Sequence, residues 1–405
     1  MKILFEPLLP GAAARRPSLA LLVTIAMLGT MALHMFIPAL PATAADLNAS
    51  PGMIQLTVTL YLVGLAAGQL IYGPLSDRFG RRPLLLGGLC LYVISTLLAA
   101  FADSAGELIV ERVFQSLGAC SGLVLGRAMV RDGTSTLEAA RTLAVLMTAM
   151  VIAPALAPGV GGYVTAWVGW RGTFAVLTCV GTVVLLLSVL ILPETHHQRT
   201  PLPGIMPMLR SYRRLLGMRV FRGYALGGCC TSTSLYAYFS SSPFLFMDVL
   251  HRSVEDVGLY SLYVACGIGT GTFLASRLVR RFGARDLART GNHVQLIGAL
   301  LLLLVDRSGM LSVATVVGTM MLLSVGSGLA TPNAAASAVG ADPQAIGAAA
   351  GLYGAMQMAF GALCSLIVGS WHSASALPMA TVLLVSAVAG QFAFAYGAKA
   401  LSATR

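Results

Sequence analysis

Gly73-Pro74-Leu75-Ser76-Asp77-Arg78-Phe79-Gly80-Arg81-Arg82-Pro83 is a short charged stretch between two long apolar runs. Glycine and proline interrupt helices, so the stretch predicts a short turn between two helices. It holds one carboxylate and three arginines between runs that belong in hydrocarbon. We therefore expect this hinge-like turn to lie at a membrane surface, where water solvates the charges.

The composition excludes an ordinary soluble protein. Of the 405 residues, 57% are hydrophobic and 10% are charged, and the mean hydropathy is +0.82. A soluble domain carries about 25% charged residues. Apolar runs of about 20 residues, which is the length that crosses a bilayer as a helix, recur along the chain. The predicted fold class is an all-α integral membrane protein.

The apolar runs predict twelve transmembrane helices. The first is long for a cleaved leader, so we expect it to be retained despite the Ala42-Thr43-Ala44 pattern after it. The expected ranges are 18–40, 53–75, 84–101, 107–126, 142–165, 172–192, 223–246, 257–279, 288–305, 310–330, 346–371 and 377–398.

The basic residues predict the orientation of these helices. With both termini in the cytoplasm, 22 of the 26 Lys and Arg residues fall on the cytoplasmic side, as the positive-inside rule requires. This distribution accounts for the net charge of +11 without a nucleic-acid partner. The seven cysteines fall inside apolar runs and are expected to be core residues.

A repeat predicts two halves. Arg78-Phe79-Gly80 recurs as Arg281-Phe282-Gly283, 203 residues later, although Arg280 stands where Asp77 would fall. A proline-containing basic stretch separates the two sets of six helices. We expect a six-helix half at residues 1–192, a cytoplasmic linker at 193–222 and a second six-helix half at 223–405, related as parallel repeats.

Several motifs resemble the major facilitator superfamily. The stretch 73–82 is similar to its signature loop, and Arg112 with Gln115 and Gly118 resembles the second motif of its drug:proton antiporters. Residues 153–162 resemble a motif of exporters, with the key positions Pro154, Pro158, Gly159 and Gly162. Pro38-Ala39-Leu40-Pro41, Gly169-Trp170-Arg171 and Ser240-Ser241-Ser242-Pro243-Phe244 narrow the resemblance to the bicyclomycin/chloramphenicol-resistance (Bcr/CflA) subfamily.

The resemblance implies proton-coupled efflux of small amphiphilic drugs or toxic compounds across a bacterial cytoplasmic membrane. The two halves would rock about a central cavity, with protons as the coupling ion, in a monomer in the lipid bilayer. The six histidines are scattered along the chain, and no H-E-x-x-H or G-x-S-x-G motif occurs, so we expect no metal site, no cofactor and no enzymatic activity. A facilitator or exporter of an endogenous metabolite is the alternative, because one fold serves many transport functions.

Four residues are expected to form a conformational latch at the inner face. Asp77 can pair with arginines across the turn and with the positive end of a neighbouring helix, and Arg81, Gly73 and Arg131 complete the set. Asp132 is a further candidate partner. Such a cluster would hold the two halves in one state and release them in the other. The alternative is that these charges only orient the helix.

Arg112, Glu111 and His34 are the candidates for proton coupling. Arg112 lies within a predicted span, where a charge normally faces the bundle or a water cavity unless it reaches the surface. Glu111 is its neighbour but projects about 100° away on a helix. His34 stands where the family usually carries an acid, and imidazole titrates near neutral pH. A buried neutral histidine without a role in coupling is equally consistent with the sequence.

The substrate cavity is expected between the halves. Met27 and Met31 share a helix face with His34, and methionine adapts to varied apolar ligands. Tyr236, Tyr238, Tyr353 and Gln357 are the other candidates, with packing as the alternative for each aromatic ring.

The acids of the second half predict substrate charge. Asp248, Glu255, Asp256, Asp286, Asp306 and Asp342 all fall in predicted loops, which leaves Glu111 as the one expected intramembrane carboxylate. We therefore expect neutral or zwitterionic substrates to be favoured over permanent cations.

Proline and glycine in the exporter motif are expected to make the fifth helix bendable and to let the first or eighth helix approach it closely.

Overall fold

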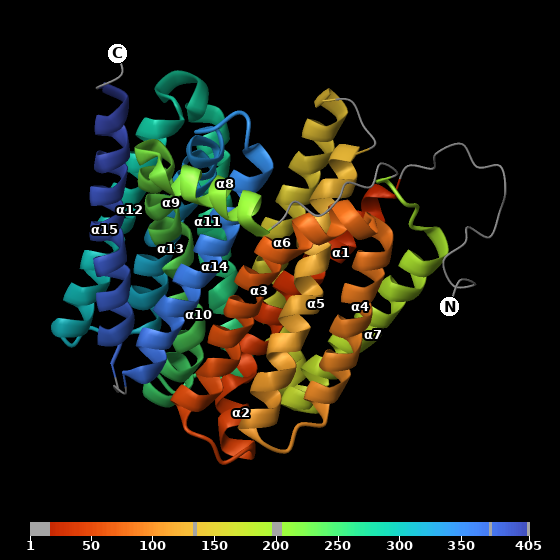
Figure 1. Cartoon of the computed structure of the whole chain (residues 1–405). Helices are drawn as coiled ribbons and strands as arrows, with labels where there is room; N and C mark the ends of the chain where they lie inside the picture. The colour runs from red at the N-terminus through yellow and green to blue at the C-terminus, as the bar shows by residue number, and fades with distance from the viewer. Residues whose placement is uncertain (1–16, 133–135, 197–204, 372–374, 403–405) are drawn as a thin grey trace.

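The computed structural model describes residues 17–132, 136–196, 205–371 and 375–402. Nearly all of these residues are helical, and the long helices run side by side in two groups (Figure 1). The elements of the first half are α1 (Leu19–Phe36), the short 3-10 helix η1 (Ile37–Ala39), α2 (Leu40–Asp46), α3 (Pro51–Phe79), α4 (Arg81–Ala100), α5 (Ala105–Asp132), α6 (Thr136–Val168) and α7 (Trp170–Ile191).

The second half follows one helix of the linker. That linker helix is α8 (Ile205–Gly217), and the rest of the linker from 197 to 204 lies outside the described residues. The elements of the second half are α9 (Arg219–Thr233), α10 (Leu235–Phe244), the π-helix η2 (Leu245–Val249), α11 (Val254–Phe282), α12 (Ala284–Arg307), α13 (Val313–Val339), α14 (Ile346–Ser370) and α15 (Leu377–Ser402).

Ten helical segments of the described chain are long and apolar enough to cross a membrane. The two remaining positions among the twelve expected spans belong to α6 and to the pair α9 and α10, which is interrupted at Ser234. The expected single seventh helix at 223–246 is therefore wrong in detail. The interruption falls in a run of Thr and Ser residues, whose side chains compete with the backbone for hydrogen bonds.

The stretch 73–83 is not the turn that its composition predicts. α3 continues through Gly73 and Pro74 to Phe79, and the chain reverses only at Gly80, whose φ is +96°. Proline removes one backbone hydrogen bond from a helix, but a long packed helix tolerates that loss. The single residue that breaks the helix is thus Gly80, because its positive φ suits glycine.

The same reversal occurs in the second half. Gly283, with a φ of +78°, ends α11 and starts α12 as Gly80 ends α3 and starts α4. The repeat in sequence is therefore a repeat in backbone conformation. It places the first turns of α4 and α12 at the same end of the molecule.

The acids of the second half also lie differently from the expectation. The helices extend about a turn beyond the apolar runs, so most of these acids lie in helix ends rather than in loops. The exception is Asp342, which lies between α13 and α14. Asp248 lies in η2, Glu255 and Asp256 in the first turn of α11, Asp286 in the first turn of α12, and Asp306 near the end of α12. None of them lies in the middle of a span.

The most extensive contacts between the halves are those of α3 with α14 and of α6 with α11. Glycines allow the close approach in both pairs. A Cβ on Gly354 would fall on the Gln69 side chain of α3, and one on Gly258 would lie 2.7 Å from the Pro158 carbonyl oxygen of α6. Small residues at a helix crossing are the usual means of close packing in a membrane.

The two ends of the molecule differ in charge. We call the end that holds Arg81, Gly283 and α8 the Arg-rich end, and the end that holds α2, η2 and Trp371 the opposite end. In Figure 1 the Arg-rich end is at the top and α2 is at the bottom.

Candidate functional site

An ion cluster at the Arg-rich end joins α3, α4 and α5. The Arg81 guanidinium donates from Nη1 to Asp77 Oδ1 at 2.6 Å and from Nε to Asp132 Oδ2 at 3.0 Å, and it also donates to the Ser76 hydroxyl. The Arg81 side chain is 9% exposed, but its partner Asp77 is 39% exposed and Asp132 is 19% exposed, so the ion pair with Asp132 is the better shielded from water. One arginine therefore fixes the ends of three helices, as its planar fork of donors allows.

Glu194 completes this cluster, and the sequence reasoning missed it. It follows α7, and its two carboxylate oxygens accept from the backbone N–H groups of Arg81 and Arg82 at 3.0 and 3.2 Å. These N–H groups belong to the first turn of α4, which has no partner inside the helix. A carboxylate at a helix N-terminus also opposes the positive end of the dipole. The sequence did carry a signal for Glu194, because it is an acid that follows Pro193 directly after a predicted span.

All of these contacts lie within the first half. Among the described residues, no ion pair joins Asp77 or Arg81 to the second half, so a latch between halves stays a prediction for another conformation. Arg131 is exposed and lies at the same end without an ion pair to Asp77. Gly73 has open space where a Cβ would stand. The structure thus brings together Asp77, Arg81 and Asp132 but not the whole predicted set.

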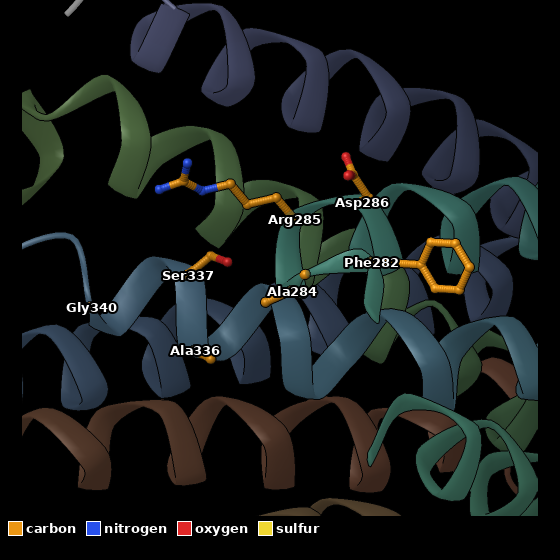
Figure 2. A pocket seen from close by; sticks show the side chains of 8 residues that line it. Phe282, Ala284, Arg285, Asp286, Ala336, Ser337 and Gly340 are labelled. Atoms are coloured by element: carbon orange, nitrogen blue, oxygen red, sulfur yellow. The ribbon is translucent and has the colours of Figure 1, made fainter. Parts of the chain in front are cut away.

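The second half has a cavity at the equivalent place. It has a volume of about 640 Å³ and is lined by residues of the Gly283 reversal and of the end of α13. Ala284 stands where the first half has Arg81, so the second half has no guanidinium at this position of the repeat. Figure 2 shows Arg285 extended on the side of Ser337, while Phe282 and Asp286 point elsewhere. The two halves are therefore unequal at the Arg-rich end.

Arg112 lies in the core of the first half and does not reach the surface. It is fully buried, and its guanidinium carbon lies 4.2 Å from the centroid of the Tyr61 ring, 5.1 Å from that of Phe36 and 5.9 Å from that of Phe174. Three rings from α1, α3 and α7 thus surround a charge carried on α5. Cation–π contact compensates part of the desolvation of a buried guanidinium.

A short chain of hydrogen bonds orients Arg112. Its Nη1 donates to Gln115 Oε1 at 2.6 Å and to the Ala32 carbonyl oxygen of α1 at 3.0 Å, and Gln115 in turn donates to Thr96 of α4 at 2.8 Å. Nε and Nη2 have no hydrogen-bond partner among the described residues. Glu111 is half-buried and forms no ion pair with Arg112 in the described chain. Arg112 therefore keeps donors that no carboxylate occupies.

His34 lies where the halves touch. Its ring is nearly perpendicular to the Phe239 ring of α10, with centroids 5.0 Å apart, and its centroid is 6.3 Å from that of Tyr236. Nδ1 lies 2.8 Å from the Thr30 carbonyl oxygen, which can only accept, so Nδ1 carries the proton. Nε2 remains as the nitrogen that can take up a second proton.

The cavity candidates divide into two groups. Met27 and Met31 are half-buried on α1, and Tyr236 is half-buried with its ring centroid 6.3 Å from that of His34. Gln357 is half-buried on α14, where it donates to Ser232 of α9 at 2.6 Å. By contrast, Tyr238 and Tyr353 are buried in hydrophobic clusters of the second half. Packing therefore explains those two rings.

The exporter motif is a packing element in this conformation. A Cβ on Gly161 would lie 1.9 Å from the Met35 carbonyl oxygen of α1, and one on Gly162 would lie 2.9 Å from the Val254 carbonyl oxygen of α11. Pro158 and Gly159 face Gly258 of α11. The close approach predicted for the first and eighth helices is present.

A second cluster that the sequence reasoning missed lies at the opposite end. Asp46, at the end of α2, accepts from Trp170 Nε1 at 2.9 Å and forms an ion pair with Arg171. Arg171 also donates to the Ala102 carbonyl oxygen at 3.0 Å and stacks on the Trp170 ring at 4.2 Å. The Gly169-Trp170-Arg171 stretch is therefore a clamp that joins α2, α7 and the turn before α5.

The comparisons with known proteins agree with this architecture. The family model of the Major Facilitator Superfamily matches residues 19–366. The fold is similar to the crystal structure of a D-xylose-proton symporter, with a TM-score of 0.73 at 17% identity over 94% of this chain and 96% of that one. The chain therefore belongs to the major facilitator superfamily and is an integral membrane transporter.

Its relatives narrow the assignment to the bicyclomycin/chloramphenicol-resistance group. The chain is 27% identical to a bicyclomycin resistance protein homolog of Haemophilus influenzae, over 88% of this chain and 89% of that protein. It is 32% identical to a chloramphenicol resistance protein of Pseudomonas aeruginosa, over 76% and 74%. It is 30% identical to multidrug resistance protein D of Escherichia coli, over 86% and 87%.

Proposed function

We propose that this transporter exports small amphiphilic compounds across the bacterial cytoplasmic membrane in exchange for protons, with the Arg-rich end and both termini in the cytoplasm. The names of its relatives support drug efflux. The distribution of basic residues supports the orientation. Neutral or zwitterionic substrates are favoured because carboxylates of the described second half lie at helix ends.

The position of His34 carries the proposal. It is a titratable side chain on α1 that is buried against Phe239 of the other half, so a proton on it would change the contact between halves. Arg112 bonds to the Ala32 carbonyl oxygen, two residues earlier on the same helix. Protonation of His34 and movement of Arg112 would therefore both act on the same turn of α1.

A transport assay tests the role of His34. Purified protein in proteoliposomes with an imposed proton gradient should move substrate several times more slowly after His34→Ala. His293→Ala is the matched control, because His293 is an exposed helical histidine of α12. Full gradient-driven transport by His34→Ala would exclude the proposed role.

The substrate class needs a separate measurement. Drug-susceptibility profiling of a pump-deficient bacterial strain that expresses the chain would identify exported compounds. A protonophore should abolish the resistance. If transport persists in the presence of the protonophore, the chain is a facilitator and not an antiporter.

A further inference from the structure

A cavity of about 320 Å³ lies at the opposite end, where the two halves meet. The start of α3 contributes Gln55 from the first half, while η2 contributes Asp248 and the residue directly after α14 is Trp371, both from the second half. The volume is at the lower end of the range for pockets that bind small organic ligands. None of the residues assigned above to proton coupling, to the latch or to transport lines this cavity.

The lining combines one negative charge with aromatic and amide groups. Asp248 is the acid, and none of the described residues that line the cavity is basic. Trp371 and Phe244 provide aromatic rings, which attract cations through their faces. Gln55 is 6% exposed, and its Oε1 has no hydrogen-bond partner among the described residues. An unused acceptor therefore stands beside the cavity, together with a carboxylate.

These groups define the chemistry of a ligand. A carboxylate forms its strongest hydrogen bonds with a charged N–H donor. Aromatic rings stabilise the same positive charge and the apolar body next to it. We propose that the cavity is a binding site for a small protonated amine with an aromatic or aliphatic body.

The site also has a conformational consequence. Its ligand would contact α3 of the first half together with η2 and α14 of the second, so it would bind tightly only while these ends are together. A ligand that favours one conformation shifts the population toward it. An amine at this site would therefore hold the halves closed at the opposite end and slow the transport cycle.

Calorimetry on the purified full chain in detergent tests the binding. The probes are phenethylammonium, which carries charge and N–H donors, and 2-phenylethanol, which has the same body without the charge. Phenethylammonium should bind about tenfold more tightly. Asp248→Asn should abolish this difference, whereas Asp103→Asn should preserve it. Asp103 is the matched control because its side chain is 92% exposed at the same end of the first half.

Two variants of Trp371 test the aromatic contribution. Trp371→Phe retains a ring and should keep most of the affinity for phenethylammonium, whereas Trp371→Leu should lower it severalfold. The thermal midpoint of each variant checks that the protein is folded. Equal affinity of the two probes, or an unchanged preference for phenethylammonium in Asp248→Asn, would overturn the proposed site.

Whether a bound amine holds the halves together at the opposite end is tested separately from the proposed transport function. Binding is measured without a proton gradient, so a failure of proton coupling leaves the calorimetric result intact. In proteoliposomes, phenethylammonium on the side of the opposite end should slow transport by the wild-type protein and leave Asp248→Asn unaffected. Binding without such slowing would overturn the conformational part of the proposal.

Discussion

At the scale of single residues, two buried arginines differ in the groups that surround them. Arg81 is fixed by Asp77 and Asp132 at 2.6 and 3.0 Å, so the loss of one carboxylate leaves the other pair in place. Arg112 has no such carboxylate among the described residues and depends on aromatic rings and neutral acceptors. The two arginines should therefore respond differently to conservative substitution.

Replacement of Asp77 should change the rate of transport rather than ligand binding. Asp77→Asn removes one ion pair of Arg81 and leaves the volume unchanged. We expect transport in proteoliposomes to slow about tenfold, which corresponds to about 1.4 kcal/mol in a barrier. Substrate affinity from calorimetry should stay within twofold. A parallel loss of affinity would contradict a conformational role, and Asp103→Asn serves as the exposed control.

Replacement of Arg112 by lysine should be severe although the charge is kept. An ammonium group lacks the planar surface that faces Tyr61 and cannot span Gln115 and the Ala32 carbonyl oxygen as a guanidinium does. We expect a more than tenfold loss of transport. Arg307→Lys, at an exposed position of α12, should be neutral in the same assay. Near-wild-type transport by Arg112→Lys would show that charge alone is sufficient.

At the scale of helices, glycine marks the crossings that the structure depends on. Gly161 and Gly159 lie two residues apart on α6 but differ in surroundings. A Cβ on Gly161 would overlap the Met35 carbonyl oxygen, whereas a Cβ on Gly159 would meet no atom within 4 Å. The same substitution at the two sites therefore separates packing from helix propensity.

Gly161→Ala should destabilise the protein, and Gly159→Ala should not. Overpacking a tight contact costs about 1–3 kcal/mol, while alanine gains about 1 kcal/mol over glycine in helix propensity. We expect a lower thermal midpoint in detergent for Gly161→Ala and an unchanged or raised midpoint for Gly159→Ala. Equal midpoints would mean that α1 and α6 move apart without penalty.

Helix ends show how far the sequence can predict such a structure. Apolar run lengths identify the spans because the bilayer sets their length, and the Gly80 and Gly283 repeat identifies the reversals. The partners of Arg81 are harder to predict. Asp132 lies one helix away and was a candidate, but Glu194 comes from after α7, and only the packing of α7 against α4 brings it near. The interruption at Ser234 and the inward orientation of Tyr238 likewise depend on neighbouring helices.

At the scale of the whole molecule, the distribution of carboxylates bears on the charge of the compounds that we propose are exported. The described acids of the second half lie at helix ends or, for Asp342, between helices, and Glu111 is only half-buried on α5. Among the described residues, a permanent cation at the middle of the membrane would find no carboxylate to compensate its desolvation.

Export should therefore depend on substrate charge. With matched neutral and quaternary ammonium forms of one fluorescent compound, we expect gradient-driven transport of the neutral form to be at least severalfold faster in proteoliposomes. Liposomes without protein correct for passive leakage of the neutral form. Efficient export of the quaternary form would contradict this prediction.

The cavity beside Gly283 has a consequence for the timescale of motion in the two halves. The Glu194 carboxylate accepts hydrogen bonds from the first backbone N–H groups of α4. The first turn of α12 has no such carboxylate partner among the described residues, and it borders an open volume of about 640 Å³. Backbone amides in the first turn of α12 should therefore exchange with deuterium faster than those of α4. Motion at the Arg-rich end would then begin in the second half, with the first half acting as the fixed frame.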